Sequence, residues 1–166
     1  AWLESLSARP MNLGLDLRGG VHFLMEVDME SAVRRMEDRY VADLRAVLRK
    51  GKVRSRSVRR KGGGGIEILL RSVTDQSKAR EVISRELSDL DVRDEDEATP
   101  EKIVVQLSQS AIDEISKFAL EQNITALRNR IDGLGVAEPL VQRQGDRRIV
   151  VQLPGVQDTA RAKRIL

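Results

Sequence analysis

The sequence has no cysteine, a single histidine and few aromatic residues among its 166 positions. Without cysteine it can form no disulfide, thiolate zinc site, iron–sulfur cluster or cysteine nucleophile. One histidine, His22, cannot supply a pair of imidazoles for metal binding or acid–base chemistry. The aromatic residues are too few for a base-stacking surface; they are Trp2, Phe23, Tyr40 and Phe118. We therefore expect no metal site, no cofactor, no catalytic residues and no enzymatic activity.

Long apolar runs and a large net charge are missing as well. The longest apolar run, residues 21–27, is interrupted by His22 and Glu26, so no segment approaches the roughly 18 apolar residues of a membrane span. Lys and Arg total 29 against 26 Asp and Glu, and the net charge of +3 does not by itself indicate nucleic-acid binding. The chain begins with Ala1 and shows no signal peptide, which predicts a piece of a longer protein.

An internal repeat is the most informative pattern that the sequence does contain. Residues 53–79 align without gaps on residues 136–162, and nine of these 27 positions are identical. Matching residues are 83 positions apart, as Gly62 and Gly145 are. This agreement predicts a duplicated module, and the alternative is a coincidence of two similar hairpins.

The same order of elements is predicted in both copies. A strand is followed by a helix with apolar residues at steps of three and four, then by a hairpin with a glycine turn and a second helix. These elements are expected at residues 21–27, 33–47, 53–70 and from Thr74, and again at 103–107, 120–134, 140–153 and from Asp158. Residues 90–93 would form the closing strand of the first copy. The order β-α-β-β-α-β is the ferredoxin-like split unit, so we predict an α+β fold of two tandem ferredoxin-like modules, the second truncated.

The predicted boundaries follow from this repeat. We expect an N-terminal segment (1–20) with the motif Asp-Leu-Arg-Gly-Gly, a first module (21–95), an acidic linker (96–101) and an incomplete second module (102–166). The linker belongs to an acidic stretch, residues 89–101, for which an exposed loop is the alternative interpretation.

Nine lysines and arginines cluster in residues 45–61. They form a candidate anion or partner patch of the kind that binds nucleic acid or anionic lipid. Solvated charges that protect an edge strand are the favoured alternative. An RNA-recognition motif is not favoured, because its third strand must carry aromatic residues and the third strands here, IEILL and IVVQL, have none. The candidate patch residues are Arg54, Arg56, Arg59, Arg60 and Lys61.

A glycine pair precedes the first predicted strand. The backbone N–H groups of Gly19 and Gly20 can hold an anion, but a phosphate loop needs a helix behind it, and here a strand follows. The favoured interpretation is a tight turn in which Asp16 pairs with Arg18 and both glycines take positive φ. A hinge or a partner contact is the other interpretation.

Two long blocks resemble the SecD family. They are LGLDLRGGVHFLMEVD at residues 13–28 and LRNRIDGLGVAEPLVQRQGDRRIVVQLPGVQDTARAK at residues 127–163, in the family's order. The resemblance carries the family motif onto Asp16, Arg18, Gly19, Gly20, Asn129, Arg130, Gly135 and Pro139. The family ties none of these positions to a chemical step, so we expect structural or hinge roles for them.

The resemblance implies a part of the first periplasmic domain of a bacterial inner-membrane protein, with a ferredoxin-like fold. Members of the SecD family assist protein export using the proton gradient, through membrane segments that lie outside this chain. The implied partners are SecF, the SecYEG channel and unfolded preprotein, which a sheet edge would accept by strand addition. The weaker alternative is a non-catalytic module that binds nucleic acid or an anionic surface through residues 45–61.

Overall fold

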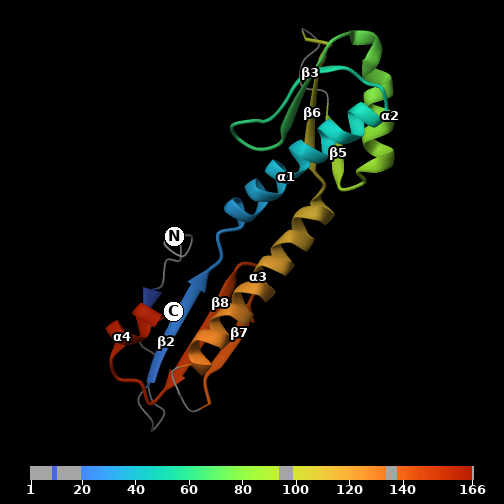
Figure 1. Cartoon of the computed structure of the whole chain (residues 1–166). Helices are drawn as coiled ribbons and strands as arrows, with labels where there is room; N and C mark the ends of the chain where they lie inside the picture. Colours follow the sequence, from blue (N-terminus) through green and yellow to red (C-terminus); the bar gives the residue numbers. More distant parts are fainter. Residues whose placement is uncertain (1–8, 11–19, 94–98, 134–137, 166) are drawn as a thin grey trace. The chain divides into compact units, whose positions relative to one another are not determined.

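The computed structural model describes residues 9–10, 20–93, 99–133 and 138–165. These residues form two four-stranded antiparallel sheets and four α-helices, so the fold is α+β, as predicted (Figure 1). None of the described helices is both long and apolar enough to cross a membrane. The chain divides into two compact units: unit 1 comprises residues 1–29 and 115–166, and unit 2 comprises residues 30–114.

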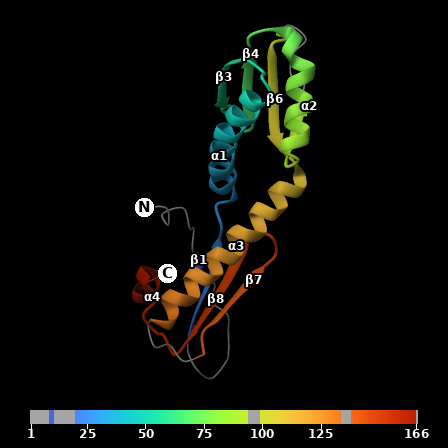
Figure 2. The same ribbon diagram turned by 45° about the vertical axis from the view of Figure 1, so that its right-hand side comes forward.

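Unit 2 contains the sheet with the strand order β3-β4-β6-β5. Its strands are β3 (Ser55–Arg60), β4 (Ile66–Leu70), β5 (Leu90–Arg93) and β6 (Lys102–Leu107), and its helices are α1 (Met29–Lys50) and α2 (Gln76–Glu86), which follows the 3-10 turn η1 (Val73–Asp75). Alternate residues of β4 are fully buried, as a strand with one face on a core requires. Helix α1 buries Leu44 and Leu48, one turn apart. Helix α2 buries Ala79, Val82 and Ile83, and Figure 2 shows both helices beside this sheet.

Unit 1 contains the sheet with the strand order β1-β2-β8-β7. Its strands are β1 (Arg9–Pro10), β2 (Gly20–Glu26), β7 (Leu140–Gln144) and β8 (Arg148–Pro154), and its helices are α3 (Gln109–Asp132) and α4 (Thr159–Ile165). Strands β2 and β8 pair along their whole lengths, from Gly20 opposite Pro154 to Glu26 opposite Arg148. Their buried residues share one apolar cluster with Leu120, Leu127 and Ile131 of α3 (Figure 2). The boundary between the units falls inside α3, after Glu114.

The hairpin and the helices on either side of it have matching elements and matching buried positions in the two sequence copies. At the offset of 83 residues, β3 corresponds to β7 and β4 to β8, and the second helices begin at the matching residues Gln76 and Thr159. Buried apolar residues match in pairs, as Ile66 does with Ile149. The structure therefore supports a duplicated module.

One side-chain hydrogen bond is repeated as well. Arg45 Nη2 donates to the carbonyl oxygen of Val58 at 2.7 Å, and Arg128 Nη2 donates to that of Val141 at 3.0 Å. Both pairs match at the same offset, and β3 and β7 are edge strands of their sheets. In each copy, an arginine of the preceding helix thus donates a hydrogen bond to a backbone carbonyl group of the edge strand. A chance similarity of two hairpins would not reproduce a contact with the helix.

The strand pairing differs from the tandem arrangement that the repeat suggested. Strand β2 pairs with β8, and β6 pairs with β4 and β5, so each sheet takes its first predicted strand from the other copy. The predicted modules, 21–95 and 102–166, therefore do not coincide with the two compact units. The physical reason is that both strands are short, mostly apolar segments that precede a helix, and this local pattern does not determine which of two similar sheets a strand joins.

The predicted acidic linker, residues 96–101, lies between β5 and β6. These two strands are antiparallel neighbours in one sheet, with Arg93 opposite Val104. The described residues on both sides of positions 94–98, Arg93 and Thr99, belong to unit 2, so the predicted linker does not separate the two compact units. Residues 96–98 lie outside the described part of the chain.

Candidate functional site

An arginine-rich groove lies along the edge strand β3 in unit 2. Its lining comes from α1, from β3 and the residues just before it, and from the residue that follows β4, and its volume is about 700 Å³. The other described side chains that line it are valines and serines, with no carboxylate among them. We call this surface the arginine groove; the arginines that line it are Arg45, Arg49, Arg54, Arg56, Arg59 and Arg71.

The backbone of the β3–β4 hairpin brings two of these arginines together. The register of the hairpin shifts between Ser55 and Ser57, so Arg56 is the extra residue of a β-bulge. Beyond the bulge, the backbone N–H of Arg71 donates to the carbonyl oxygen of Arg54 at 2.9 Å. This bond continues the antiparallel pairing by one residue, so Arg54 and Arg71 lie opposite each other just beyond the paired ends of β3 and β4.

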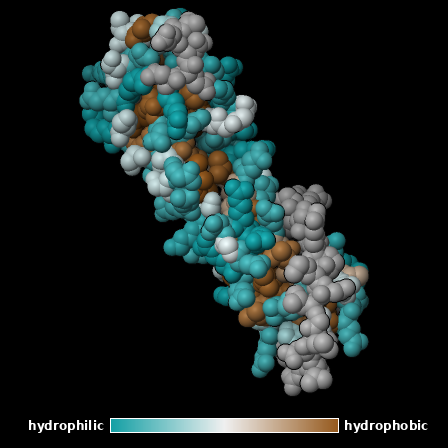
Figure 3. Space-filling model, turned by 180° about the vertical axis from the view of Figure 1, so that it is seen from behind, coloured by the Kyte–Doolittle hydropathy of each residue, from teal (hydrophilic) through white to brown (hydrophobic). Residues whose placement is uncertain are grey.

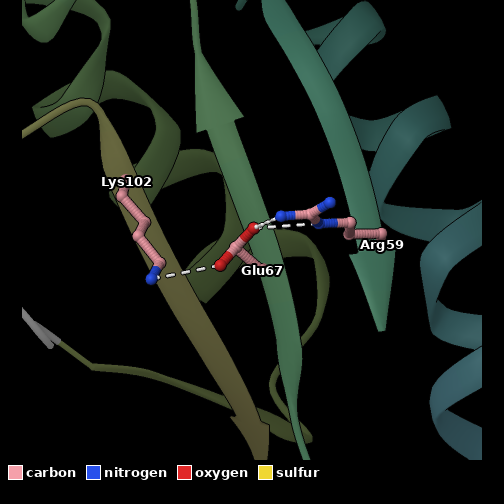
Figure 4. Close-up of polar contacts among 3 residues, drawn as sticks. All are labelled: Arg59, Glu67 and Lys102. Carbon is pink, nitrogen blue, oxygen red and sulfur yellow. Dashed lines mark hydrogen bonds and ion pairs between the residues drawn. The ribbon is translucent and has the colours of Figure 1, made fainter. Parts of the chain in front are cut away.

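Two groove arginines have partners within the protein. Arg45 holds the carbonyl of Val58, and Arg59 holds the carboxylate of Glu67 with Nε at 3.0 Å and Nη2 at 2.7 Å. Lys102 Nζ approaches the other oxygen of Glu67 at 3.1 Å, so this carboxylate lies between two cations (Figure 4). The hydrogen bonds from Arg59 and then from Lys102 lower the pKa of Glu67 below its usual value.

The other four groove arginines have no such partner. Within the described part of the chain, no hydrogen bond or ion pair neutralises the side chains of Arg49, Arg54, Arg56 and Arg71. All four residues are exposed. The groove therefore presents several guanidinium groups whose hydrogen-bond donors are available to a ligand.

Only some residues of the predicted basic patch line the arginine groove. Arg54, Arg56 and Arg59 line the groove, whereas Arg60 pairs with Asp38 at 3.0 Å and Lys61 also interacts within the protein. The structure adds Arg49 from α1 and Arg71 from the end of β4. The sequence signal for Arg71 was its place directly after the strand that forms the hairpin with the arginine-rich one.

None of the described family motif residues lines the groove. Asp16, Arg18, Gly19 and Gly135 are outside the described residues. Asn129 and Arg130 are exposed in the last turn of α3, and Pro139 precedes β7. Gly20 is the first residue of β2 and pairs with Pro154.

Gly20 is explained by a close approach of two strands, and the predicted positive φ is wrong for this residue. Its φ does not lie in the left-handed region. A Cβ atom here would lie 3.0 Å from the carbonyl oxygen of Leu153 and 3.2 Å from Cα of Pro154. Both atoms belong to backbone that is held in the sheet, so any side chain would force the strands apart.

The described residues contain no cluster of side chains that could hold a metal ion. No three His, Asp or Glu side chains gather there as a metal site would require.

The side chain of Tyr40 has a hydrogen-bond partner and a shifted pKa. Its hydroxyl donates to Asp89 Oδ2 at 2.6 Å. Burial and this hydrogen bond raise the pKa of Tyr40 to about 12, so the phenol stays neutral and ties α1 to the residues before β5.

Exposed apolar residues do not contribute to the groove. The face drawn in Figure 3 is mostly hydrophilic, with hydrophobic areas between the polar side chains. The large apolar residues that are exposed in the described part are Val73, Phe118 and Leu140, and none of them lines the groove. The polar character of the groove therefore comes from its arginines and serines.

Two family models match parts of the chain. The model described as "Protein translocase subunit SecDF, P1 domain, N-terminal" matches residues 120–166, and the model described as "SecD/SecF GG Motif" matches residues 5–30. Both regions overlap the sequence blocks that resemble the SecD family. No solved structure matches the chain.

Curated relatives match almost the whole chain. Protein translocase subunit SecD of Pseudomonas aeruginosa is 47% identical over 165 residues, which are 99% of this chain and 26% of that protein. The SecD subunits of Haemophilus influenzae and Escherichia coli K12 are 45% and 44% identical, over 100% and 99% of this chain and 26% of each relative. The chain thus spans about a quarter of the length of these relatives. As a partial sequence, it belongs to the SecD family of protein translocase subunits.

Proposed function

We propose that this chain is a periplasm-facing part of a SecD subunit that assists the export and release of preproteins by the Sec translocase. The observation that carries the proposal is the identity of 44–47% to SecD subunits, which extends over nearly the whole chain. In this proposal the proton gradient is used by membrane segments outside these residues. The chain itself performs no enzymatic step.

The proposed partners are SecF, the SecYEG channel and unfolded preprotein. The GG-motif model is described as common to SecD and SecF, which supports a partnership with SecF. Nucleic acid is not a proposed partner, because the arginine groove has no aromatic lining on which bases could stack.

We also propose that both units are ferredoxin-like. In unit 1, β2, α3, β7, β8 and α4 follow the β-α-β-β-α order, with residues 30–114 inserted between β2 and the part of α3 that belongs to unit 1. In unit 2, β6 takes the sheet position beside β4 that β2 takes beside β8. An experimental structure of the chain tests this assignment through the strand orders.

Strand addition of a client is not proposed at β3 or β7. Arg45 and Arg128 already donate to carbonyl groups of these edge strands, and Arg56 interrupts β3 with a bulge. A client strand would have to displace these contacts before it could pair. For the motif residue Gly20, its pairing in β2 supports a structural role at a close strand contact.

A chimeric SecD tests the role in export. The matching segment of Escherichia coli SecD is replaced by this chain, and the export of a Sec-dependent precursor is measured in cells depleted of their own SecD. We expect the chimera to restore export, because the identity covers 99% of this chain. A SecD that lacks the segment is the negative control. A chimera that reaches the membrane at normal levels but restores no export would overturn the proposal.

A further inference from the structure

The four unpartnered arginines of the groove carry charge that the described part of the protein does not neutralise. A backbone hydrogen bond holds Arg54 and Arg71 opposite each other at the end of the β3–β4 hairpin, and like charges that face each other across paired strands are destabilising. On the same sheet Arg59 is neutralised by Glu67 at 2.7 Å. Unpaired positive charge that is concentrated on a concave surface attracts an anionic ligand.

The second copy of the repeat shows that the fold does not require these arginines. Its hairpin has the same elements, and Arg128 makes the same edge-strand hydrogen bond as Arg45. The residues that correspond in sequence to Arg49, Arg54, Arg56 and Arg71 are Asp132, Ala137, Pro139 and Pro154. The arginine that supports the edge strand is thus present in both copies, whereas the unpartnered arginines occur only in the first. A structural requirement would apply to both copies, so these arginines have another role.

We propose that the arginine groove binds an extended, carboxylate-rich polypeptide segment. A guanidinium group is planar and donates two parallel hydrogen bonds to a carboxylate. The volume of about 700 Å³ is far larger than one inorganic anion and is typical of sites that hold several chemical groups. In an extended segment alternate side chains lie on one side, about 7 Å apart, so alternating acidic residues present several carboxylates to one surface.

The segment is held by side chains and not by addition to the sheet. The carbonyl of Val58 already accepts a hydrogen bond from Arg45, and the bulge at Arg56 interrupts the edge. The hydroxyl groups of Ser55 and Ser57 add neutral donors to the same lining. Recognition therefore depends on the number of carboxylates and weakens as salt screens the charges.

Nucleic acid and membrane surfaces fit the groove less well. Single-stranded nucleic acid binds by stacking on aromatic rings, and the described lining contains only arginine, valine and serine. A bilayer is engaged by cationic faces that also insert apolar side chains, and no exposed large apolar residue of the described part lines the groove. The inference concerns the ligand of the groove alone, so it stands independently of the proposed role in export.

Fluorescence anisotropy with the full chain tests the proposal. The probe is a fluorescein-labelled peptide of about ten residues in which Glu and Ser alternate, an arrangement that matches the spacing of an extended chain. The matched control peptide has Gln in place of every Glu. We expect the Glu peptide to bind, the Gln peptide not to bind, and binding to be lost between about 50 mM and about 500 mM salt.

A triple variant locates the binding in the groove. Arg54→Gln, Arg56→Gln and Arg71→Gln together should weaken binding of the Glu peptide by about tenfold or more, because charge-assisted hydrogen bonds are lost. The melting temperature without peptide should stay the same or rise, because the like-charge pair is removed. The control variant carries Lys117→Gln, Arg147→Gln and Lys163→Gln, which remove the same charge from unit 1 and should leave binding unchanged. If the triple variant does not fold, Arg56→Gln alone replaces it.

Three results would overturn the proposal. One is equal affinity for the Glu and Gln peptides. Another is equal weakening by the groove variant and its charge-matched control, which would mean that net charge alone attracts the peptide. The third is binding of an oligothymidine or of phosphatidylglycerol vesicles through the groove arginines, without binding of the Glu peptide.

Discussion

At the residue scale, Glu37 is the charged side chain that the described structure buries. It is 4% exposed, and its Oε1 accepts the backbone N–H of Gly65 at 2.6 Å. Its Oε2 has no hydrogen-bond partner within the described part. The apolar periodicity of α1 places Met36, the residue before Glu37, on the inner face of the helix. This periodicity gives no indication that Glu37 would accept a hydrogen bond from the glycine turn.

Replacing Glu37 tests how much this buried hydrogen bond contributes to the free energy of unfolding. Glu37→Ala leaves the N–H of Gly65 buried without an acceptor and should lower the free energy of unfolding by about 1–3 kcal/mol. Glu37→Gln keeps an acceptor oxygen and should cost less. Asp38→Ala is the control, because it removes only an exposed ion pair with Arg60 and should cost less than about 1 kcal/mol. Urea denaturation measures all three, and equal losses for Ala and Gln at Glu37 would contradict the explanation.

The carboxylate of Glu67 predicts a pH dependence of stability. Arg59 and Lys102 lower its pKa in the folded state, so its contribution is present above the unfolded pKa of about 4.5 and is lost as the pH falls through the folded value. Glu67→Gln should therefore lower stability at pH 7 by roughly 0.5–1 kcal/mol, and the difference from wild type should disappear as the pH falls from the unfolded pKa of about 4.5 through the lower folded pKa. Urea denaturation across this range measures that difference. A constant difference at every pH would show that the ion pair is not its cause.

At the element scale, sequence periodicity placed most strands and helices close to their observed bounds. The closing strand of the first copy was predicted at residues 90–93, where β5 lies. The start of the second helix was less accurate, since a 3-10 turn precedes α2 and Ser72 accepts from the N–H of Thr74 at 3.3 Å. Caps depend on the local path of a few residues, for which Ser72, Thr74 and Asp75 are all suitable residue types.

The two glycines at Gly20 and Gly62 should respond differently to a methyl group. Gly20→Ala places Cβ 3.0 Å from a backbone oxygen and should cost about 1–3 kcal/mol. Gly62→Ala is the matched control, because nothing lies within 4 Å of its Cβ position and its φ is not in the left-handed region. Replacing glycine by alanine at a compatible position usually stabilises a protein by about 0.4–1 kcal/mol. We therefore expect Gly62→Ala to leave the free energy of unfolding unchanged or to raise it by an amount up to this range. Thermal unfolding compares the two, and equal stability would contradict the close-approach argument.

At the scale of the whole molecule, the exchange of β2 and β6 determines which segments can fold alone. Unit 2 contains all four strands of its sheet within residues 30–114. The predicted module 21–95 lacks β6, which lies between β4 and β5 and contributes fully buried residues such as Ile103 and Val105. Without this inner strand the sheet is divided and its core is exposed to water.

Expression of the two segments tests the exchange directly. We expect residues 30–114 to unfold cooperatively in urea, with a dispersed amide NMR spectrum, and residues 21–95 to remain unfolded. The shared residues 30–95 make each segment the control for the other. Cooperative folding of 21–95 would mean that β2 can replace β6 beside β4, and that the pairing is not selective.

The sequence by itself determined the SecD family, the α+β class, the internal repeat and the position of most strands, because motifs and periodicity are local properties of a chain. The tertiary structure alone decided that β2 joins β8, that Glu37 is buried, and that Arg71 lies opposite Arg54. These features depend on contacts between residues that are distant in sequence. Two short, mostly apolar strands that each precede a helix look alike in the local pattern, so only packing of the complete sheets distinguishes their places.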